Sequence, residues 1–385
     1  MMGLLSLASL LLIGTPVPPE KYDRKTMNRR SVISIALCWL LAVAALGCTS
    51  DDSTAPSTTK APGGRNQSGQ GSSSTTPPAA PSAGCRADRL APGRTEMTVR
   101  SGGHDRTYIR YVPEGLATGE PAPLVVDFPA YSPASLEESF SGFTKPDQAG
   151  KVKADEVGAV VVTPEPVNGA GALLTWNFVG TPGWTDDQQF VTDLLDHVEA
   201  TACIDPDRVL AMGFAIGAVF ASITACEQAE RFAALATVSG LYSPAGCKPT
   251  KAVPVLSFHG TGDRFIPFDG SVGSGAAGLG LSPETTSGLI FMTSREGARA
   301  SSAAWADHGG CRTQPEVEPV VDGVTREVWS DCEVASTVEL YVIEGGEHTW
   351  PGSNGMAAFE GLLGPVSHDI VANDVIWDFF ERATS

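Results

Sequence analysis

The stretch Val209-Leu210-Ala211-Met212-Gly213-Phe214-Ala215-Ile216-Gly217-Ala218-Val219-Phe220 decides the fold of this chain. It opens with an apolar run of strand-forming character that ends at Gly213, and after Gly217 an apolar run of helical character continues to Cys226. Two glycines four residues apart suit a crowded turn, because neighbouring backbones there leave no room for a Cβ. The stretch therefore predicts a buried strand that turns sharply into a helix.

A sharp strand-to-helix turn between two glycines is the layout of a nucleophile elbow, whose central residue is normally a serine. The central residue here is Ala215. A methyl group has no proton to release and no lone pair with which to attack. The stretch thus predicts the frame of a hydrolytic site without its attacking atom. The alternative is a helix start with two incidental glycines, since short motifs also arise by chance.

The composition is that of a folded, acidic protein. The chain has 385 residues, with 42% hydrophobic and 18% charged residues, which suits one large domain with a sizeable core. Its formal net charge of −18 argues against nucleic acids and anionic membrane surfaces as partners, because both would repel such a surface.

The sequence of residues 1–48 indicates an N-terminal extension followed by an export signal. The signal begins at Met27, with a basic start that includes Arg29-Arg30, an apolar run and the small-residue end Ala45-Leu46-Gly47-Cys48. This end resembles a bacterial lipobox, so we expect export with lipid attachment at Cys48; simple cleavage is the alternative. We also expect translation to start at Met27, and the arginine pair is typical of twin-arginine export.

Residues 49–84 are rich in Ser, Thr, Pro and Gly and contain almost no large apolar side chain. Such a segment cannot bury enough surface to fold, so it predicts a disordered tether. The folded domain is expected at residues 85–385, held away from a membrane by the tether if Cys48 carries lipid.

Within residues 85–385, strand and helix patterns alternate. Besides the 209–212 run, strands are predicted at residues 97–100, 107–112, 124–128, 159–163, 233–239, 253–259 and 338–343. Helices are predicted at residues 187–200, 293–308 and 369–382. This alternation is typical of an α/β protein with a mostly parallel twisted sheet and helices on both faces. Residues 270–288 are expected to form a surface insertion.

Six cysteines lie beyond the signal segment, and an even number in an exported chain indicates disulfides. Pairing neighbours along the chain gives Cys226–Cys247 and Cys311–Cys332, which leaves Cys85–Cys203. Six cysteines allow about 15 connectivities, so other pairings stay open. A metal site is the competing interpretation, but no Cys-x-x-Cys or Cys/His pair has the spacing of metal ligands.

An acid and a histidine should follow an elbow, each on a loop after a later strand. Asp263 follows the strand at 253–259, and His348 follows the strand at 338–343. Both positions, and the order of acid before histidine, match what is expected after a nucleophile elbow. Asp269 is an alternative acid, farther from its strand. Alternatively, Asp263 only shapes a turn and His348 is a surface residue. His259 is expected to brace a turn.

Four stretches carry a resemblance to a known family: Ala122-Pro123-Leu124-Val125-Val126-Asp127-Phe128, Cys203-Ile204-Asp205-Pro206-Asp207-Arg208-Val209, His259-Gly260-Thr261-Gly262-Asp263 and Gly345-Gly346-Glu347-His348-Thr349-Trp350-Pro351-Gly352. Residues 85–382 resemble the secreted polyhydroxybutyrate depolymerase/feruloyl esterase family of α/β-hydrolases. The resemblance implies the α/β-hydrolase fold, hydrolysis of polymer or aryl esters through a serine triad, and the disulfide pairing given above.

The chain departs from that family in two places. The family usually has serine where this chain has Ala215, and His-Gly where this chain has Pro129-Ala130. The second stretch belongs to a loop that supplies an oxyanion-stabilising N–H, and Pro129 has none. The amides of Tyr131 and Ile216 are the expected replacements. Two changes at catalytic positions predict impaired chemistry.

The expected function is an exported esterase-like protein of impaired catalysis that binds a polyester, a polysaccharide-linked ester or an aryl ester. Aromatic side chains suited to such a cleft are Tyr131, Trp176 and Trp350, with Trp184 as a further candidate. No cofactor and no metal are expected. Two alternatives stay open: a working hydrolase in which His348 and Asp263 activate water, and a purely structural envelope lipoprotein.

Overall fold

The computed structural model describes residues 80–86, 90–117, 119–169, 174–178, 180–243, 246–275, 297–333 and 336–385. These belong to one compact unit. The export signal, Cys48, residues 49–79 of the predicted tether and most of the predicted 270–288 insertion lie outside the described residues. Within them, no helix is both long and apolar enough to span a bilayer.

Ten strands form one sheet in the order β1-β2-β4-β3-β5-β6-β7-β10-β9-β8. The strands are β1 (Gly93–Ser101), β2 (His104–Val112), β3 (Ala122–Phe128), β4 (Val160–Pro164), β5 (Ile204–Phe214), β6 (Ala234–Val238), β7 (Val255–Gly260), β8 (Glu316–Val321), β9 (Val324–Trp329) and β10 (Val338–Ile343). The six central strands pair in parallel, while β1, β2, β8 and β9 pair antiparallel at the two ends of the sheet.

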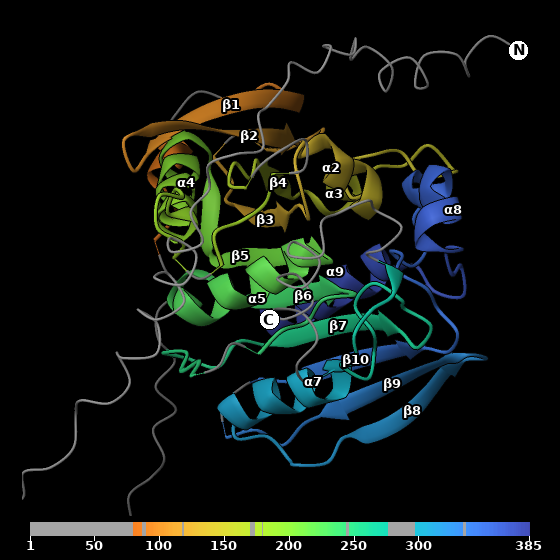
Figure 1. Ribbon diagram of the computed structural model, residues 1–385. Coiled ribbons are helices and arrows are strands. Elements are labelled where there is room, and N and C mark those ends of the chain that lie inside the picture. Colours follow the sequence, from red (N-terminus) through yellow and green to blue (C-terminus); the bar gives the residue numbers. More distant parts are fainter. Residues whose placement is uncertain are drawn as a thin grey trace, which may run out of the picture. The chain divides into compact units, whose positions relative to one another are not determined.

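Helices cover both faces of this sheet (Figure 1). The α-helices are α2 (Ser135–Ser141), α3 (Lys153–Val157), α4 (Asp187–Thr201), α5 (Ile216–Glu227), α7 (Gly297–His308), α8 (Glu360–Leu363) and α9 (Ala372–Ala383). Helices α4, α5 and α7 pack on one face and α2 and α9 on the other. The fold is that of the α/β-hydrolases, as the sequence predicts.

The central strands form because their residues are continuously apolar, which suits strands that are covered on both faces. Every residue of β3, β4, β6, β7 and β10 is buried. The eight predicted strands all occur, with boundaries that differ by a few residues. The hairpin of β8 and β9 was not predicted, and residues 293–296 of one predicted helix lie outside the described part.

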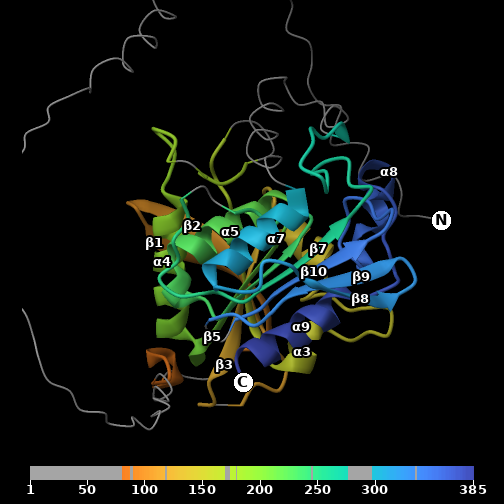
Figure 2. The same ribbon diagram turned by 90° about the horizontal axis from the view of Figure 1, so that it is seen from below.

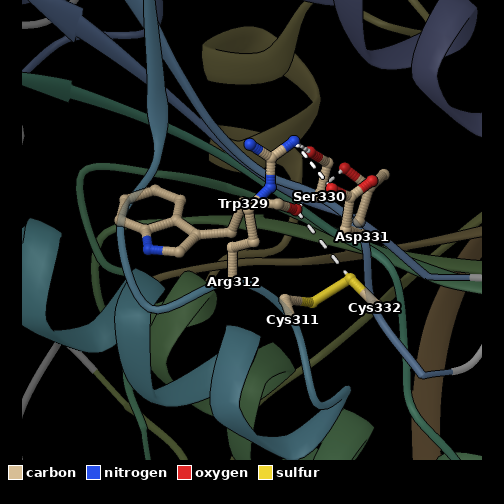
Figure 3. Close-up of a disulfide and its surroundings, with 7 residues drawn as sticks. Cys311, Arg312, Trp329, Ser330, Asp331 and Cys332 are labelled. Atoms are coloured by element: carbon tan, nitrogen blue, oxygen red, sulfur yellow. Dashed lines mark hydrogen bonds and ion pairs between the residues drawn. A yellow bond between two sulfur atoms is a disulfide. The ribbon is translucent and has the colours of Figure 1, made fainter.

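The three predicted disulfides are present: Cys85–Cys203, Cys226–Cys247 and Cys311–Cys332. The third joins the chain after α7 to the chain after β9 (Figure 3). Beside it, Arg312 Nη2 donates to Ser330 Oγ at 3.0 Å and lies 3.0 Å from Asp331 Oδ2. These contacts fasten the outer hairpin to α7.

Candidate active site

The turn between β5 and α5 has the strained backbone of an elbow. Ala215 adopts φ 52° and ψ −120°, a conformation that an L-residue with a side chain rarely takes. Its N–H donates to the Val238 carbonyl at 3.0 Å, which ties the turn to β6. Strained residues of this kind occur where the surrounding structure holds them in place, often at functional sites. The alanine thus occupies a strained backbone position at the turn from β5 into α5.

The two glycines of the elbow are required by close packing. A Cβ on Gly217 would lie 1.9 Å from the Phe128 carbonyl oxygen, and one on Gly213 would lie 2.7 Å from the Gly217 carbonyl carbon. No side chain fits at either distance. These contacts press the elbow against the end of β3, and with it against the loop that begins at Pro129.

Asp263 and His348 meet at the carboxyl edge of the sheet. His348 Nδ1 donates to Asp263 Oδ2 at 2.7 Å, and both residues are buried. The other oxygen of Asp263 accepts the N–H groups of Phe265 and Ile266 at 2.8 and 2.9 Å. Burial opposes ionisation of Asp263, but the charge of His348 and these hydrogen bonds outweigh it, so the pKa of Asp263 lies below its ordinary value.

In a neutral imidazole this bond would place the proton on Nδ1 and leave the lone pair on Nε2. The imidazole lies between two aromatic rings, with centroids 4.8 Å from Phe214 and 5.0 Å from Phe265. Phe214 directly precedes Ala215. The imidazole therefore lies beside the strand end that leads into the elbow.

The alternatives considered for the acid and the base have other roles. His259 Nε2 donates to the Ile266 carbonyl at 2.7 Å, and burial lowers the pKa of His259, so the residue is a neutral brace of the turn. Asp269 accepts the N–H of Ser271 at 2.9 Å at the surface and has no contact with His348. The structure brings Asp263, and not Asp269, to the histidine.

The two predicted oxyanion residues belong to the start of α5 and to the loop after β3. Ile216 is the first residue of α5, where backbone N–H groups have no acceptor within the helix. Tyr131 lies three residues after the end of β3 and is half-buried, and burial raises the pKa of Tyr131 to about 12. Its phenol is therefore neutral at physiological pH and able to donate a hydrogen bond.

Trp176 and Trp350 do not line a cleft, which corrects the prediction from the sequence. Both are buried, with exposed fractions of 0% and 1%. Trp176 stacks on Phe220 of α5 at 4.3 Å, and its Nε1 donates to the Pro129 carbonyl at 2.7 Å. This bond holds the loop after β3 in place.

Trp350 holds the histidine loop instead. Its Nε1 donates to Asn373 Oδ1 at 3.1 Å, and Asn373 Nδ2 donates to the Ser141 carbonyl at 2.8 Å. This chain of bonds connects the loop of His348 to α9 and α2. No sequence signal pointed to Asn373 or Ser141, whereas Phe265, two residues after Asp263, was identifiable from its position.

Among the described residues, no group of three or more His, Cys, Asp or Glu side chains is arranged to hold a metal ion. The chemistry that these residues can support is proton transfer by His348, oriented by Asp263, together with stabilisation of negative charge by backbone N–H groups.

The sheet topology, with the Asp263–His348 pair at its carboxyl edge, is that of the α/β-hydrolase fold. No protein-family model matches the chain. The chain is similar to feruloyl esterase B of Piromyces equi, with 27% identity over 249 residues, which cover 63% of this chain and 42% of that protein.

Two further similarities are with proteins named esterases. A bifunctional acetylxylan esterase/xylanase of Neocallimastix patriciarum is 32% identical over 115 residues, or 30% of this chain and 16% of that protein. The solved acetyl xylan esterase of Aspergillus awamori aligns with a TM-score of 0.45 and 13% identity, covering 75% of this chain and 99% of that one. The chain spans about half of the length of the curated relatives it matches first.

Proposed function

We propose that this chain is an exported relative of polyhydroxybutyrate depolymerases and feruloyl esterases that binds an ester-bearing polymer but lacks the covalent route of hydrolysis. The observation that carries the proposal is the backbone of Ala215, which keeps a nucleophile's conformation while its side chain is a methyl group. Feruloyl and acetylxylan esterases among the similar proteins support a polysaccharide-linked or aryl ester as the ligand. The disulfides support export into an oxidising compartment, with lipid on Cys48 as the proposed anchor.

The catalytic impairment is expected to be large. In a well-studied serine protease, loss of the nucleophile lowers turnover by about six orders of magnitude. Here Pro129 also removes an N–H from the oxyanion loop. The remaining machinery, His348 oriented by Asp263 and the amides of Tyr131 and Ile216, fits a site that has lost its attacking group.

Replacing the missing oxygen tests the proposal. Ala215→Ser should raise turnover of soluble aryl esters by several orders of magnitude over the wild type, because His348 Nε2 would then accept the serine proton. Ala218→Ser, which adds the same hydroxyl within α5, is the matched control and should stay inactive. A folded Ala215→Ser protein without esterase activity on a broad ester panel contradicts the proposal.

A second candidate function is direct hydrolysis by water. The free Nε2 of His348, with Nδ1 bonded to Asp263, favours it because such an imidazole can act as a general base. Wild-type hydrolysis above background that disappears in His348→Ala would establish this route. Equal rates in the wild type and His348→Ala would exclude it.

A further inference from the structure

His259, the last residue but one of β7, is a buried titratable side chain that the proton transfers described above do not use. Strands β7 and β10 are parallel neighbours (Figure 2), so the turn after β7 and the loop after β10 meet at one edge of the sheet. The exposed fraction of His259 is 3%. Any effect of this imidazole on a ligand therefore passes through its neighbours.

A chain of hydrogen bonds connects His259 to the candidate acid and base. His259 Nε2 donates to the Ile266 carbonyl at 2.7 Å, and the N–H of the same Ile266 donates to Asp263 Oδ1 at 2.9 Å. The other oxygen, Asp263 Oδ2, accepts from His348 Nδ1 at 2.7 Å. The carboxylate thus lies between two buried imidazoles, one bonded to it directly and the other through Ile266.

His259 also lies close enough to the carboxylate to compete for it. Its Nε2 is 3.5 Å from Asp263 Oδ2, the oxygen that His348 uses. A charged His259 would need acceptors on both nitrogens, but its Nδ1 has no hydrogen-bond partner in the described part of the chain. Burial lowers the pKa of His259, although the charge of Asp263 opposes the shift. The ring is therefore neutral, and its single proton is directed at Ile266.

The backbone of the acid's turn is fixed separately. Gly262 N–H donates to the Gly346 carbonyl at 2.9 Å, which ties the start of the turn to the loop of His348. The direction of the Asp263 carboxylate depends instead on the N–H groups it accepts at the end of the turn, and His259 holds the Ile266 end. A loss of the His259 bond is expected to rotate the carboxylate without separating the two loops.

We propose that His259 is a positioning residue, which stays neutral with its proton on Nε2 and holds Ile266 so that Asp263 presents one oxygen to His348 alone. The inference rests on the function proposed above, in which His348 is the base. It concerns the proton that His348 holds on Nδ1, so it can be tested with and without turnover.

The test with turnover uses the Ala215→Ser background and soluble aryl esters. His259→Asn should lower kcat about a hundredfold with little change in KM, because its amide is too short to reach Ile266 and the base is misplaced. His259→Gln, whose amide nitrogen reaches the position of Nε2, should restore most of the rate. Trp305→Phe is the matched control: it removes a buried 2.8 Å bond from a ring N–H to the Tyr242 carbonyl and should leave kcat unchanged.

Nuclear magnetic resonance of the chain with Ala215 in place needs no turnover. The ¹⁵N shifts of His259 should report a neutral ring protonated on Nε2 from about pH 5 to 8, where an ordinary histidine changes its charge. The downfield resonance of the His348 Nδ1 proton should move upfield in His259→Asn and stay in place in His259→Gln.

A proton on Nδ1 of His259, or a charged ring in that pH range, would overturn the proposal even if His259→Asn failed to fold. An unchanged kcat and an unchanged His348 resonance in a folded His259→Asn protein would overturn it as well. Inactivity of Ala215→Ser itself would contradict the function proposed above, whereas the resonances of His259 and His348 would still decide the positioning role. The two failures are therefore distinguishable.

Discussion

Ala215 is held in a conformation that favours glycine, with φ 52° and ψ −120°. Such strain amounts to about 1–3 kcal/mol and persists only because the elbow is packed against β3 and β6. In an active enzyme the strain presents the nucleophile. Here the strained position carries a methyl group, which fits the proposal that the chain keeps the elbow geometry without a nucleophile.

Ala215→Gly should therefore raise the free energy of unfolding by about 1 kcal/mol, because relief of the strain exceeds the added entropy of the unfolded chain. Chemical denaturation monitored by circular dichroism measures the change. Ala218→Gly, at a regular helical position in α5, is the control and should lower stability by about 1 kcal/mol. A destabilised Ala215→Gly protein would show that the turn is not strained.

The residues of the site could be predicted where a position in the fold dictates them. Asp263 and His348 were identifiable because each follows a buried strand at the edge where α/β folds place their chemistry. The roles of Trp176 and Trp350 could not be predicted, since an indole fits a cleft and a core equally well. Only the three-dimensional neighbours, such as Phe220 beside Trp176, distinguish the two.

Asp127 of β3 is a buried acid near the oxyanion loop. Burial and the charge of Glu138 raise the pKa of Asp127 to about 8, although a 2.7 Å hydrogen bond from Ser141 opposes the shift. Glu137 is also buried, and burial together with Asp127 raises the pKa of Glu137 well above its ordinary value. The folded protein thus holds protons here that the unfolded chain releases.

The sign of the pH dependence follows from that difference. Asp127 loses its proton near pH 3.8 when unfolded and near pH 8 when folded, so unfolding free energy falls as pH rises between these values. Asp127→Asn, which imitates the neutral acid, should reduce this fall and be more stable than the wild type at pH 8 by about 1 kcal/mol or more. Urea unfolding at pH 4, 6 and 8 measures both profiles.

The surface residue Asp269 is the control for this comparison. Its hydrogen bonds with Ser271 lower the pKa of Asp269, so its contribution to stability is present above its unfolded value and is lost as pH falls. Asp269→Asn should therefore change the dependence of unfolding free energy on pH in the direction opposite to the change caused by Asp127→Asn. Parallel profiles for the wild type and Asp127→Asn would mean that the Asp127 carboxyl is ionised when folded.

At the scale of elements, buried strands were predictable and exposed ones were not. The parallel strands are continuous apolar runs, and such runs can be recognised from the sequence alone. Strand β8 is exposed along its whole length and contains Pro319, so neither alternation nor propensity identifies it. The Asp322-Gly323 pair that connects it to β9 is a hairpin signal that the sequence did offer.

A buried ion pair helps to hold the segment between β4 and α4. Arg106 of β2 lies 2.8 Å from Asp187, and both side chains are almost fully buried. Burial lowers the pKa of Arg106, but the carboxylate of Asp187 opposes that shift. The guanidinium also lies 3.8 Å from the ring centre of Phe190. This pair connects the antiparallel end of the sheet to the start of α4.

Arg106→Ala should lower the free energy of unfolding by about 3–5 kcal/mol, because it leaves the buried Asp187 carboxylate with hydrogen bonds but without a positive charge beside it. The exposed pair Arg100–Asp105, with side chains 66% and 71% exposed, is the control. Arg100→Ala should change stability by less than about 1 kcal/mol. Equal effects of the two substitutions would show that the buried pair is dispensable.

For the whole molecule, the three disulfides differ in how much chain they enclose. Cys85–Cys203 has a sequence separation of 118 residues, whereas the other two each have a separation of 21. The long bridge joins the start of the domain to β5, the strand that leads into the elbow. Cross-links act mainly by restricting the unfolded chain, and the restriction grows with the length of the loop.

Removing the long bridge should therefore be the most harmful of the three deletions. The double variant Cys85→Ala/Cys203→Ala is expected to lose about 5 kcal/mol of unfolding free energy, and deletion of either short bridge about 3 kcal/mol. The two short bridges have equal separations, so they are matched controls: Cys311–Cys332 at the outer hairpin and Cys226–Cys247 after α5 should give similar losses. Denaturation of the three double variants under non-reducing conditions measures the order. If deletion of the long bridge had the smallest effect, stabilisation would come from native contacts around each cystine, and the entropy of the unfolded chain would not be its source.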